Sequence, residues 1–338
     1  MTPIRFGLIG AGKHGSRYAK HIVEDIPQAQ LVALCRRDRR EGEQLAARYG
    51  CDYYTDYRQL LDDGRIDAVA IAVPPALHGM IVPAACQAGK HILLEKPFAV
   101  SVAEGERLRA IIATSGVRCM VAHTLRFNVV VQTFKKHIAE IAPLHSFYLS
   151  QRFEPSPLLW LDRKAESGGG IILHTGVHSF DLLRFLSGYE VTTVHCEMRS
   201  MVTRKTEDNF TMLCQLRDPA TQHEMSGAVA GSRSTASRSG LIELSGEHGQ
   251  LVGDHHHGFA YLLKGTERIS LAVAPAVPTV REVIQSFVDG IHKGTAFPIT
   301  PDDGLRAVAI AEACYRSAGS GQRVPVLMRN PAGGEGKA

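Results

Sequence analysis

Residues 4–16 read IRFGLIGAGKHGS, and this stretch decides the fold of the first part of the chain. The apolar run 4–9 predicts a buried strand that leads through a glycine-rich turn into a helix over 14–24. In this context Gly10 permits a tight turn, Gly12 lets a phosphate approach the backbone, and Gly15 lets helix and strand pack closely. The helix N-terminus favours an anion. The pattern predicts a dinucleotide-binding turn whose cofactor contacts are Gly10, Gly12, Lys13, His14 and Gly15.

The alternation of strand and helix continues to about residue 125. Glycines 50, 89 and 116 mark the ends of three helices. Such alternation predicts right-handed crossovers and a doubly wound parallel sheet. We assign residues 1–125 to a dinucleotide-binding Rossmann domain. The predicted strands are 4–9, 29–35, 68–73, 91–94 and 117–122, and the predicted helices are 14–24, 39–49, 76–88 and 101–115.

A different pattern follows after about residue 140. Short segments of alternating polarity are separated by turn-like pieces, which predicts an antiparallel meander and an open sheet. We assign 126–330 to a second domain of α+β type, built on a mainly antiparallel sheet, and predict that the tail 331–338 is disordered. The predicted strands are 191–198, 210–216, 224–230, 241–245, 250–252 and 259–263, and the predicted helices are 176–187, 279–293 and 301–318.

The composition excludes several classes of protein. The 38 basic and 34 acidic residues are well mixed, so we expect no nucleic-acid partner. No window is apolar enough to span a membrane, and the N-terminus lacks the pattern of a signal peptide. The seven cysteines show no regular spacing, which favours reduced thiols and a cytoplasmic location.

The end of the second predicted strand bears on cofactor choice. NAD-preferring sites usually place an acidic residue there to bind the ribose hydroxyls, whereas this chain has Arg36 and Arg37. Paired arginine N–H groups suit a 2′-phosphate, so the sequence favours NADP(H). Asp38 leaves NAD(H) open if it reaches the ribose. A solvated basic turn without a ligand is the third interpretation.

Residues 168–181, GGGIILHTGVHSFD, place two histidines four positions apart. His174 and His178 could share a zinc ion on one helix face, but a third ligand would have to come from elsewhere. The stretch 255–257, HHH, reads as a solvated loop between strands. No complete ligand set appears, so we predict no metal site. Two core histidines are the remaining interpretation.

The segment 90–100, KHILLEKPFAV, ends a buried strand with Glu95-Lys96-Pro97. Ligands in doubly wound sheets lie beyond the carboxyl ends of the strands, which places Lys96 toward the reactive end of a cofactor. A surface lysine beside a turn proline is the alternative.

Four segments together resemble the glucose-fructose oxidoreductase / inositol dehydrogenase / rhizopine catabolism protein family. They are 7–15 (GLIGAGKHG), 72–108 around EKP, 168–188 around HTGVH, and 301–326. The resemblance implies a dehydrogenase or reductase that acts on a carbinol carbon of a sugar, cyclitol or related polyol. It also implies that 126–330 is a substrate-binding and oligomerisation domain, which forms a homodimer or homotetramer through the C-terminal sheet.

The resemblance further implies roles for single residues. Pro74, His78 and Glu95 would line the cofactor site, and Lys96 would be catalytic, with a cis bond to Pro97. Relatives commonly carry an aspartate at the place of His174 and a histidine at that of His178. We therefore expect His178 to be the acid or base, with Lys96 bonding the same oxygen, and His174 to orient the substrate. Further substrate contacts are predicted at Arg126, Asn128, Trp160 and Asp181.

Two other functions fit the same motifs. One is a glycoside hydrolase that uses a tightly bound dinucleotide for transient oxidation, as some relatives do. The other is a non-catalytic regulator that senses a dinucleotide. The retained Lys96 and His178 argue against the regulator.

Overall fold

A computed structural model describes residues 2–328, which form two compact units. The first unit comprises 2–99, 103–124 and 278–305, and the second comprises 100–102, 125–277 and 306–328. The tail predicted to be disordered, 331–338, lies outside the described residues.

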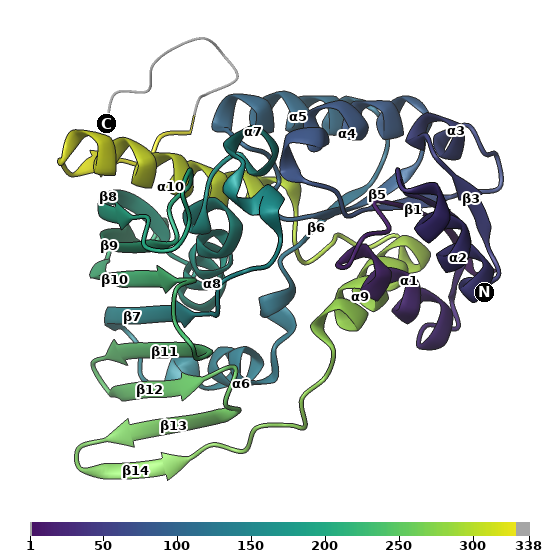
Figure 1. Cartoon of the computed structure of the whole chain (residues 1–338). Coiled ribbons are helices and arrows are strands. Elements are labelled where there is room, and N and C mark those ends of the chain that lie inside the picture. Colours follow the sequence, from purple (N-terminus) through teal and green to yellow (C-terminus); the bar gives the residue numbers. More distant parts are fainter. Residues whose placement is uncertain (1, 329–338) are drawn as a thin grey trace. The chain divides into compact units, whose positions relative to one another are not determined.

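The first unit contains a six-stranded parallel sheet with the order β3-β2-β1-β4-β5-β6 (Figure 1). The order reverses between β1 and β4, which is the switch point where open α/β sheets bind ligands. This confirms the predicted Rossmann sheet. The strands are β1 (Ile4–Ile9), β2 (Ala29–Cys35), β3 (Asp52–Tyr54), β4 (Ala68–Ile71), β5 (His91–Glu95) and β6 (Cys119–Ala122).

Helices cover both faces of this sheet (Figure 1). The short elements β3 and α3 were not predicted. Helix α9 was assigned from the sequence to the second domain, but it packs on α1, and its Phe287 ring lies 5.7 Å from that of Phe6 in β1. The helices are α1 (Gly15–Glu24), α2 (Arg39–Tyr49), α3 (Tyr57–Leu61), η1 (Pro75–Leu77), α4 (His78–Gln87), α5 (Val102–Thr114) and α9 (Thr279–Lys293).

The second unit contains a nine-stranded sheet with the order β14-β13-β12-β11-β7-β10-β9-β8-β15. The predicted meander was wrong in one respect, because the unpredicted strand β7 lies between β10 and β11 and pairs in parallel with β10. The sheet is still mainly antiparallel. Its strands are β7 (Leu144–Arg152), β8 (Glu190–Arg199), β9 (Asn209–Arg217), β10 (Glu224–Ser232), β11 (Ser239–Gly246), β12 (Gly249–Asp254), β13 (Phe259–Lys264), β14 (Glu267–Ser270) and β15 (Val324–Pro325).

Helices α6 and α8 lie against this sheet, with α8 on β7 and α6 on β12 and β13 (Figure 1). Helix α10 begins in the first unit and continues in the second. The helical segments are η2 (Thr124–Phe127), α6 (Val129–His137), η3 (Ile138–Glu140), η4 (Leu159–Asp162), α7 (Lys164–Ser167), η5 (Ile172–Gly176), α8 (Val177–Ser187) and α10 (Pro301–Ser320).

The two faces of the nine-stranded sheet differ in burial. Alternate residues along each strand point to opposite faces, so paired residues form rows across the sheet. One row is buried throughout: Cys196, Met212, Val229, Leu149, Ile242, Gly253 and Ala260. No member of the adjacent row is buried: His195, Leu213, Ala228, Tyr148, Glu243, Val252, Tyr261 and Ser270. The unit thus has an inner face that forms its core and an outer face that is accessible in the single chain.

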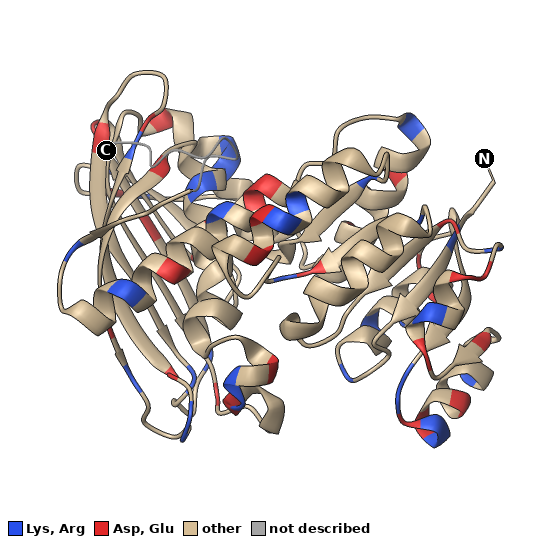
Figure 2. Cartoon of the chain, turned by 90° about the horizontal axis from the view of Figure 1, so that it is seen from above, with Lys and Arg blue, Asp and Glu red and all other residues tan. Residues whose placement is uncertain are grey.

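Basic and acidic residues are interspersed on the helices of both units (Figure 2). The arginines at 36, 37, 39 and 40 gather where β2 ends and α2 begins. Within 2–328, none of the helices combines the length and the apolar character that crossing a membrane requires.

Candidate functional site

The glycine turn after β1 has one open side. Gly10 has a φ of +96°, and a Cβ there would lie 2.5 Å from the carbonyl oxygen of Ala72. A Cβ on Gly15 would lie 2.1 Å from the carbonyl oxygen of Gly10, whereas one on Gly12 would meet no atom within 4 Å. The first and last glycines therefore close the turn. Gly12 leaves room at the N-terminus of α1, which fits a bound pyrophosphate.

A buried carboxylate joins this turn to the EKP segment. Glu95 Oε1 accepts hydrogen bonds from His14 Nε2 at 2.5 Å and from the Tyr18 hydroxyl at 2.6 Å. Glu95 Oε2 accepts the backbone N–H of Lys96 at 3.1 Å. Burial disfavours the charged form, but His14, Lys96 and Tyr18 outweigh it and lower the pKa of Glu95 to about 2. Glu95 is thus an anion that positions the turn. Lys13, the other predicted cofactor contact beside His14, is exposed.

Lys96 is the only residue of Ile92–Ala99 that is not buried. Its bond to Pro97 is cis, as expected. Of the two predicted cofactor-lining residues on the neighbouring segment, Pro74 is half-buried at the start of η1. His78 is completely buried, and burial lowers its pKa to about 4. The EKP segment is therefore a rigid, buried support that presents a single reactive side chain.

The arginines after β2 differ in their contacts. Arg36 is half-buried, donates to the carbonyl oxygen of Ala11 at 2.7 Å, and pairs with Glu41. Arg37 is exposed. Asp38 caps α2 by accepting the backbone N–H of Glu41 at 2.9 Å. Arg36 thus supports the glycine turn, and Asp38 already has a structural partner.

The HTGVH segment exposes only its histidines. Between residues 169 and 183 every residue is buried except His174 and His178, which are half-exposed. The predicted helix over 176–187 begins at Val177, and a π-helical turn, η5, directly precedes it. Such widened turns are frequent at functional sites. The second unit thus presents two imidazoles from an otherwise buried segment.

A second buried carboxylate holds this segment. Glu207 accepts the backbone N–H groups of Gly170 at 3.1 Å and Ile172 at 3.0 Å, and the hydroxyl of Tyr315 at 2.7 Å. Burial raises the pKa of Glu207, although these donors oppose the effect. Glu207 could not be identified from the sequence, because its partners lie 35 or more positions away and only the fold brings them together.

His174 contacts Arg233 and Trp160, which belong to the same unit. Arg233, which follows β10, donates from Nη2 to His174 Nδ1 at 2.8 Å and to the hydroxyl of Thr175 at 2.9 Å. The Trp160 ring meets the imidazole edge to face, with centroids 5.9 Å apart. Trp160, predicted to stack on a sugar, therefore packs against a predicted site residue. Arg233 was not identified from the sequence.

Three other predicted substrate residues have structural partners. Arg126 and Asp181 form a buried, two-pronged ion pair, with Nε–Oδ2 and Nη2–Oδ1 distances of 2.8 and 2.5 Å. Asn128 caps α6 by accepting the backbone N–H of Val130 at 2.9 Å, and it donates to the carbonyl oxygen of His255 at 3.2 Å. These contacts explain the presence of the three polar residues, and no ligand is needed for that explanation. Substrate binding by them stays a prediction.

No group of three or more metal-ligating side chains that could hold a metal ion occurs among residues 2–328. The HHH stretch is a turn between β12 and β13, but the interpretation as a solvated loop was wrong for its first member. His255 is buried beside Gly240, and burial lowers its pKa to about 4. His256 and His257 are exposed.

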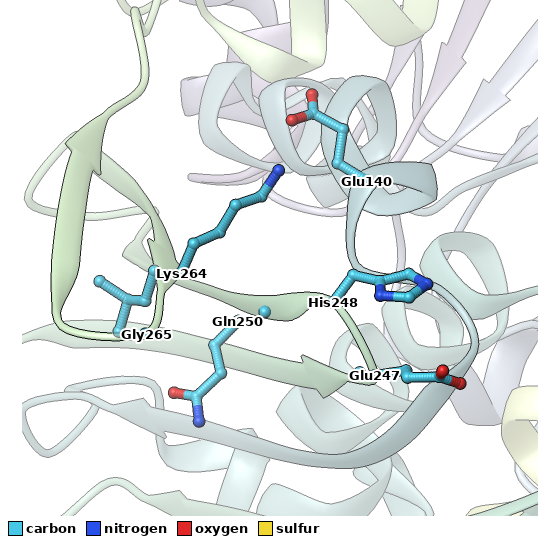
Figure 3. Close-up of a pocket in the computed structure, with 9 residues that line it drawn as sticks. Glu140, Glu247, His248, Gln250, Lys264 and Gly265 are labelled. Carbon is cyan, nitrogen blue, oxygen red and sulfur yellow. The ribbon is translucent and has the colours of Figure 1, made fainter.

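The second unit also has an open hollow of about 760 Å³ at the ends of β12 and β13 (Figure 3). The Lys264 side chain extends from β13 toward η3, which carries Glu140 (Figure 3). Predicted site residues do not line this hollow. Its size alone therefore does not identify it as the reaction site.

Two family models match the chain. Residues 4–123 match the oxidoreductase family with an NAD-binding Rossmann fold, and residues 135–326 match the C-terminal alpha/beta domain of the same oxidoreductase family. Together they cover most of the chain.

Individual relatives agree with these models. Inositol 2-dehydrogenase of Rhizobium meliloti is 27% identical, over 96% of this chain and 99% of the relative. The scyllo-inositol 2-dehydrogenase (NAD(+)) of Bacillus subtilis is 30% identical over 56% of each chain. A levoglucosan dehydrogenase solved with NADH and levoglucosan has the same fold, with a TM-score of 0.85 and 22% identity, over 96% of this chain and all of the other.

Replacing Asp181 by Asn tests its structural role. The change removes the charge of Asp181 from its two-pronged pair with the buried Arg126, so the free energy of unfolding should fall by about 3–5 kcal/mol. Denaturant unfolding measures this loss. Glu154→Gln is the matched control, because the Glu154–Arg238 pair is exposed and should contribute at most about 1 kcal/mol. Unchanged stability of Asp181→Asn would instead favour a substrate contact.

Proposed function

The chain belongs to the oxidoreductase family with an NAD-binding Rossmann fold, and we propose that it transfers a hydride to or from a carbinol carbon of a sugar, cyclitol or related polyol. One observation carries the proposal. In each unit a buried segment exposes only side chains that can handle a proton, Lys96 in one and His174 and His178 in the other. The inositol and levoglucosan dehydrogenases among the relatives support the substrate class.

The proposed chemistry needs a proton carrier beside the reacting oxygen. When bound, a nicotinamide dinucleotide accepts or supplies the hydride. The hydroxyl proton must leave in oxidation and return in reduction. We assign this proton to His178, with Lys96 bonding the same oxygen and His174 orienting the substrate. Rigid support of all three residues favours these roles, because side chains on fixed backbones lose little entropy on binding.

The glycine turn and the end of β2 would hold the dinucleotide. Gly12 and the N-terminus of α1 would take the pyrophosphate. We propose NADP(H) as the preferred cofactor, with Arg37 and Arg36 binding the 2′-phosphate. The use of Asp38 as a helix cap supports this preference, because that carboxylate already accepts a backbone N–H group. The NAD-dependent and NADH-bound relatives make NAD(H) the alternative.

We propose that the outer face of the nine-stranded sheet joins two copies of the chain into a homodimer, or pairs of dimers into a homotetramer. Its central row places the exposed Leu213 near Ala228 and Tyr148, and places Val252 beside Tyr261. Apolar side chains on an accessible sheet face gain free energy when a second copy covers them. The interspersed polar residues of the same row suit the rim of such an interface.

We further propose that the enzyme works in the cytoplasm. All seven cysteines are free thiols in the structure. Cys51 is half-buried, and the other six are buried: Cys35, Cys86, Cys119, Cys196, Cys214 and Cys314. Reduced, mostly buried thiols are usual for proteins of reducing compartments.

The variant Lys96→Met tests the reaction. It keeps the length of the side chain but removes the donor, so turnover should fall by about 10²–10⁴-fold. Absorbance of the reduced nicotinamide follows turnover on a panel of sugars, cyclitols and their acids, and fluorescence titration follows cofactor binding, which should be unchanged. Lys20→Met, exposed on α1, is the control.

Other outcomes of the Lys96→Met experiment would redirect the assignment. Near wild-type turnover of this variant would contradict the role of Lys96. A dinucleotide that co-purifies and shows no net consumption while a glycoside is cleaved would favour the hydrolase. Binding of a dinucleotide without turnover of any compound would favour the regulator.

The variant Arg37→Ala tests the cofactor preference. Loss of a charge-assisted phosphate contact should lower the ratio of kcat/KM for NADP(H) to that for NAD(H) by about tenfold or more. Arg40→Ala, also exposed but on α2, should leave the ratio nearly unchanged. A wild-type enzyme that already prefers NAD(H) would refute the proposal.

The variant Leu213→Arg tests the interface. A charge on the outer face should convert the oligomer to a monomer in light-scattering measurements, because it would be buried without a partner. Val23→Arg, at an exposed position of α1, is the control. An unchanged mass for Leu213→Arg would exclude this face as the interface.

A further inference from the structure

The contact between Arg233 and His174 fixes where the imidazole proton lies. A guanidinium has N–H donors only and stays protonated in proteins. Because Arg233 Nη2 lies 2.8 Å from His174 Nδ1, that nitrogen must accept through its lone pair. An imidazole whose Nδ1 accepts is neutral and carries its proton on Nε2. Protonating Nδ1 would break the bond and bring two cations together.

The surroundings of Arg233 keep this contact in place. The same Nη2 donates to the hydroxyl of the buried Thr175, and the Arg233 backbone N–H donates to the carbonyl oxygen of Asp208 at 2.8 Å. Burial lowers the pKa of Arg233, whereas the nearby carboxylates of Glu207 and Asp208 raise it. The Arg233 guanidinium therefore has the carboxylates of Glu207 and Asp208 nearby, and its hydrogen bond to Thr175 holds it beside η5.

The imidazole is also fixed from another side. Trp160 packs edge to face against it, with an interplanar angle of 63°. His178, one turn further along the same segment, is the other half-exposed titratable group there. A flip of the ring would move Nδ1 away from Arg233 and break their hydrogen bond. Nε2–H therefore has a constant direction.

We infer that Arg233 is a positioning residue that holds His174 as the neutral Nε2–H tautomer, so that His174 donates a hydrogen bond to a substrate oxygen and takes no part in proton transfer. The inference rests on the proposed function for its substrate, but the tautomer itself does not. An ionised aspartate at position 174 could only accept hydrogen bonds, whereas His174 in this tautomer donates one from Nε2. The substrate group facing it must then offer a lone pair.

Nitrogen NMR of histidine tests the tautomer without any assay of activity. The full-length protein is labelled with ¹⁵N-histidine, and His174→Gln identifies the His174 signals among those of the 16 histidines. At neutral pH we expect a pyrrole-type Nε2 and a pyridine-type Nδ1 in the wild type, and a mixture of tautomers in Arg233→Met. Arg233→Lys should restore the wild-type pattern in part, because an ammonium group is also a pure donor. An Nδ1–H tautomer or an imidazolium in the wild type would overturn the inference.

Kinetics with two matched variants tests the donor role. The amide of Gln reaches the position of Nε2 and can donate there, whereas that of Asn reaches only the position of Nδ1. His174→Asn should therefore lower kcat/KM by about 10- to 100-fold, the effect of one lost hydrogen bond, and His174→Gln should lose clearly less. The pH profile of kcat/KM should keep its shape in His174→Gln.

The two measurements separate the failure of the inference from that of the proposed function. Equal losses in both variants, or disappearance of a titration from the pH profile in His174→Gln, would show that His174 itself transfers a proton and would overturn the donor role. If no polyol is turned over, the proposed function fails, and the NMR result still decides the tautomer.

Discussion

Two buried carboxylates fix the backbone segments from which the reactive side chains project. A buried carboxylate is costly unless several donors satisfy it, and this requirement ties distant parts of the chain together. Glu95 does so for the turn carrying His14 and for Lys96, and Glu207 does so for the segment carrying His174. Both carboxylates accept from a tyrosine hydroxyl and from backbone N–H groups, but Glu95 also interacts with the charges of His14 and Lys96. Their pKa values accordingly shift in opposite directions.

The sequence was sufficient for those parts of the fold that local patterns determine. The runs 4–9 and 29–35 are the strands β1 and β2 to the residue, and helix α2 has its predicted bounds. The steric need for glycine at Gly10 and Gly15 was also predictable, since a turn between a strand and a packed helix leaves no room for a side chain. Lys96 and His178 are half-exposed, and the roles assigned to them from their motifs stay predictions.

Features that depend on long-range pairing could not be predicted in this way. Strand β7 lies at the centre of its sheet because β10 and β11 both pair with it, and the sequence of β7 contains no sign of these partners. Helix α9 packs beside α1 although more than 250 residues separate them. The pairing of Arg126 with Asp181 likewise spans 55 positions. A charged residue near a motif is easily interpreted as a ligand contact, because the sequence does not show which residue it pairs with in the fold.

Because η5 is a π-helical turn, the relative position of the His174 and His178 imidazoles depends on the number of residues in that turn as well as on their identity. A π turn contains about one residue more than an α turn, and each residue of a helix rotates the chain by about 100°. Loss of one residue there would leave His178 on its helix and swing position 174 away from Arg233. Insertion and deletion, and not substitution alone, are therefore routes by which this scaffold could exchange one set of polar contacts for another while its core stays the same.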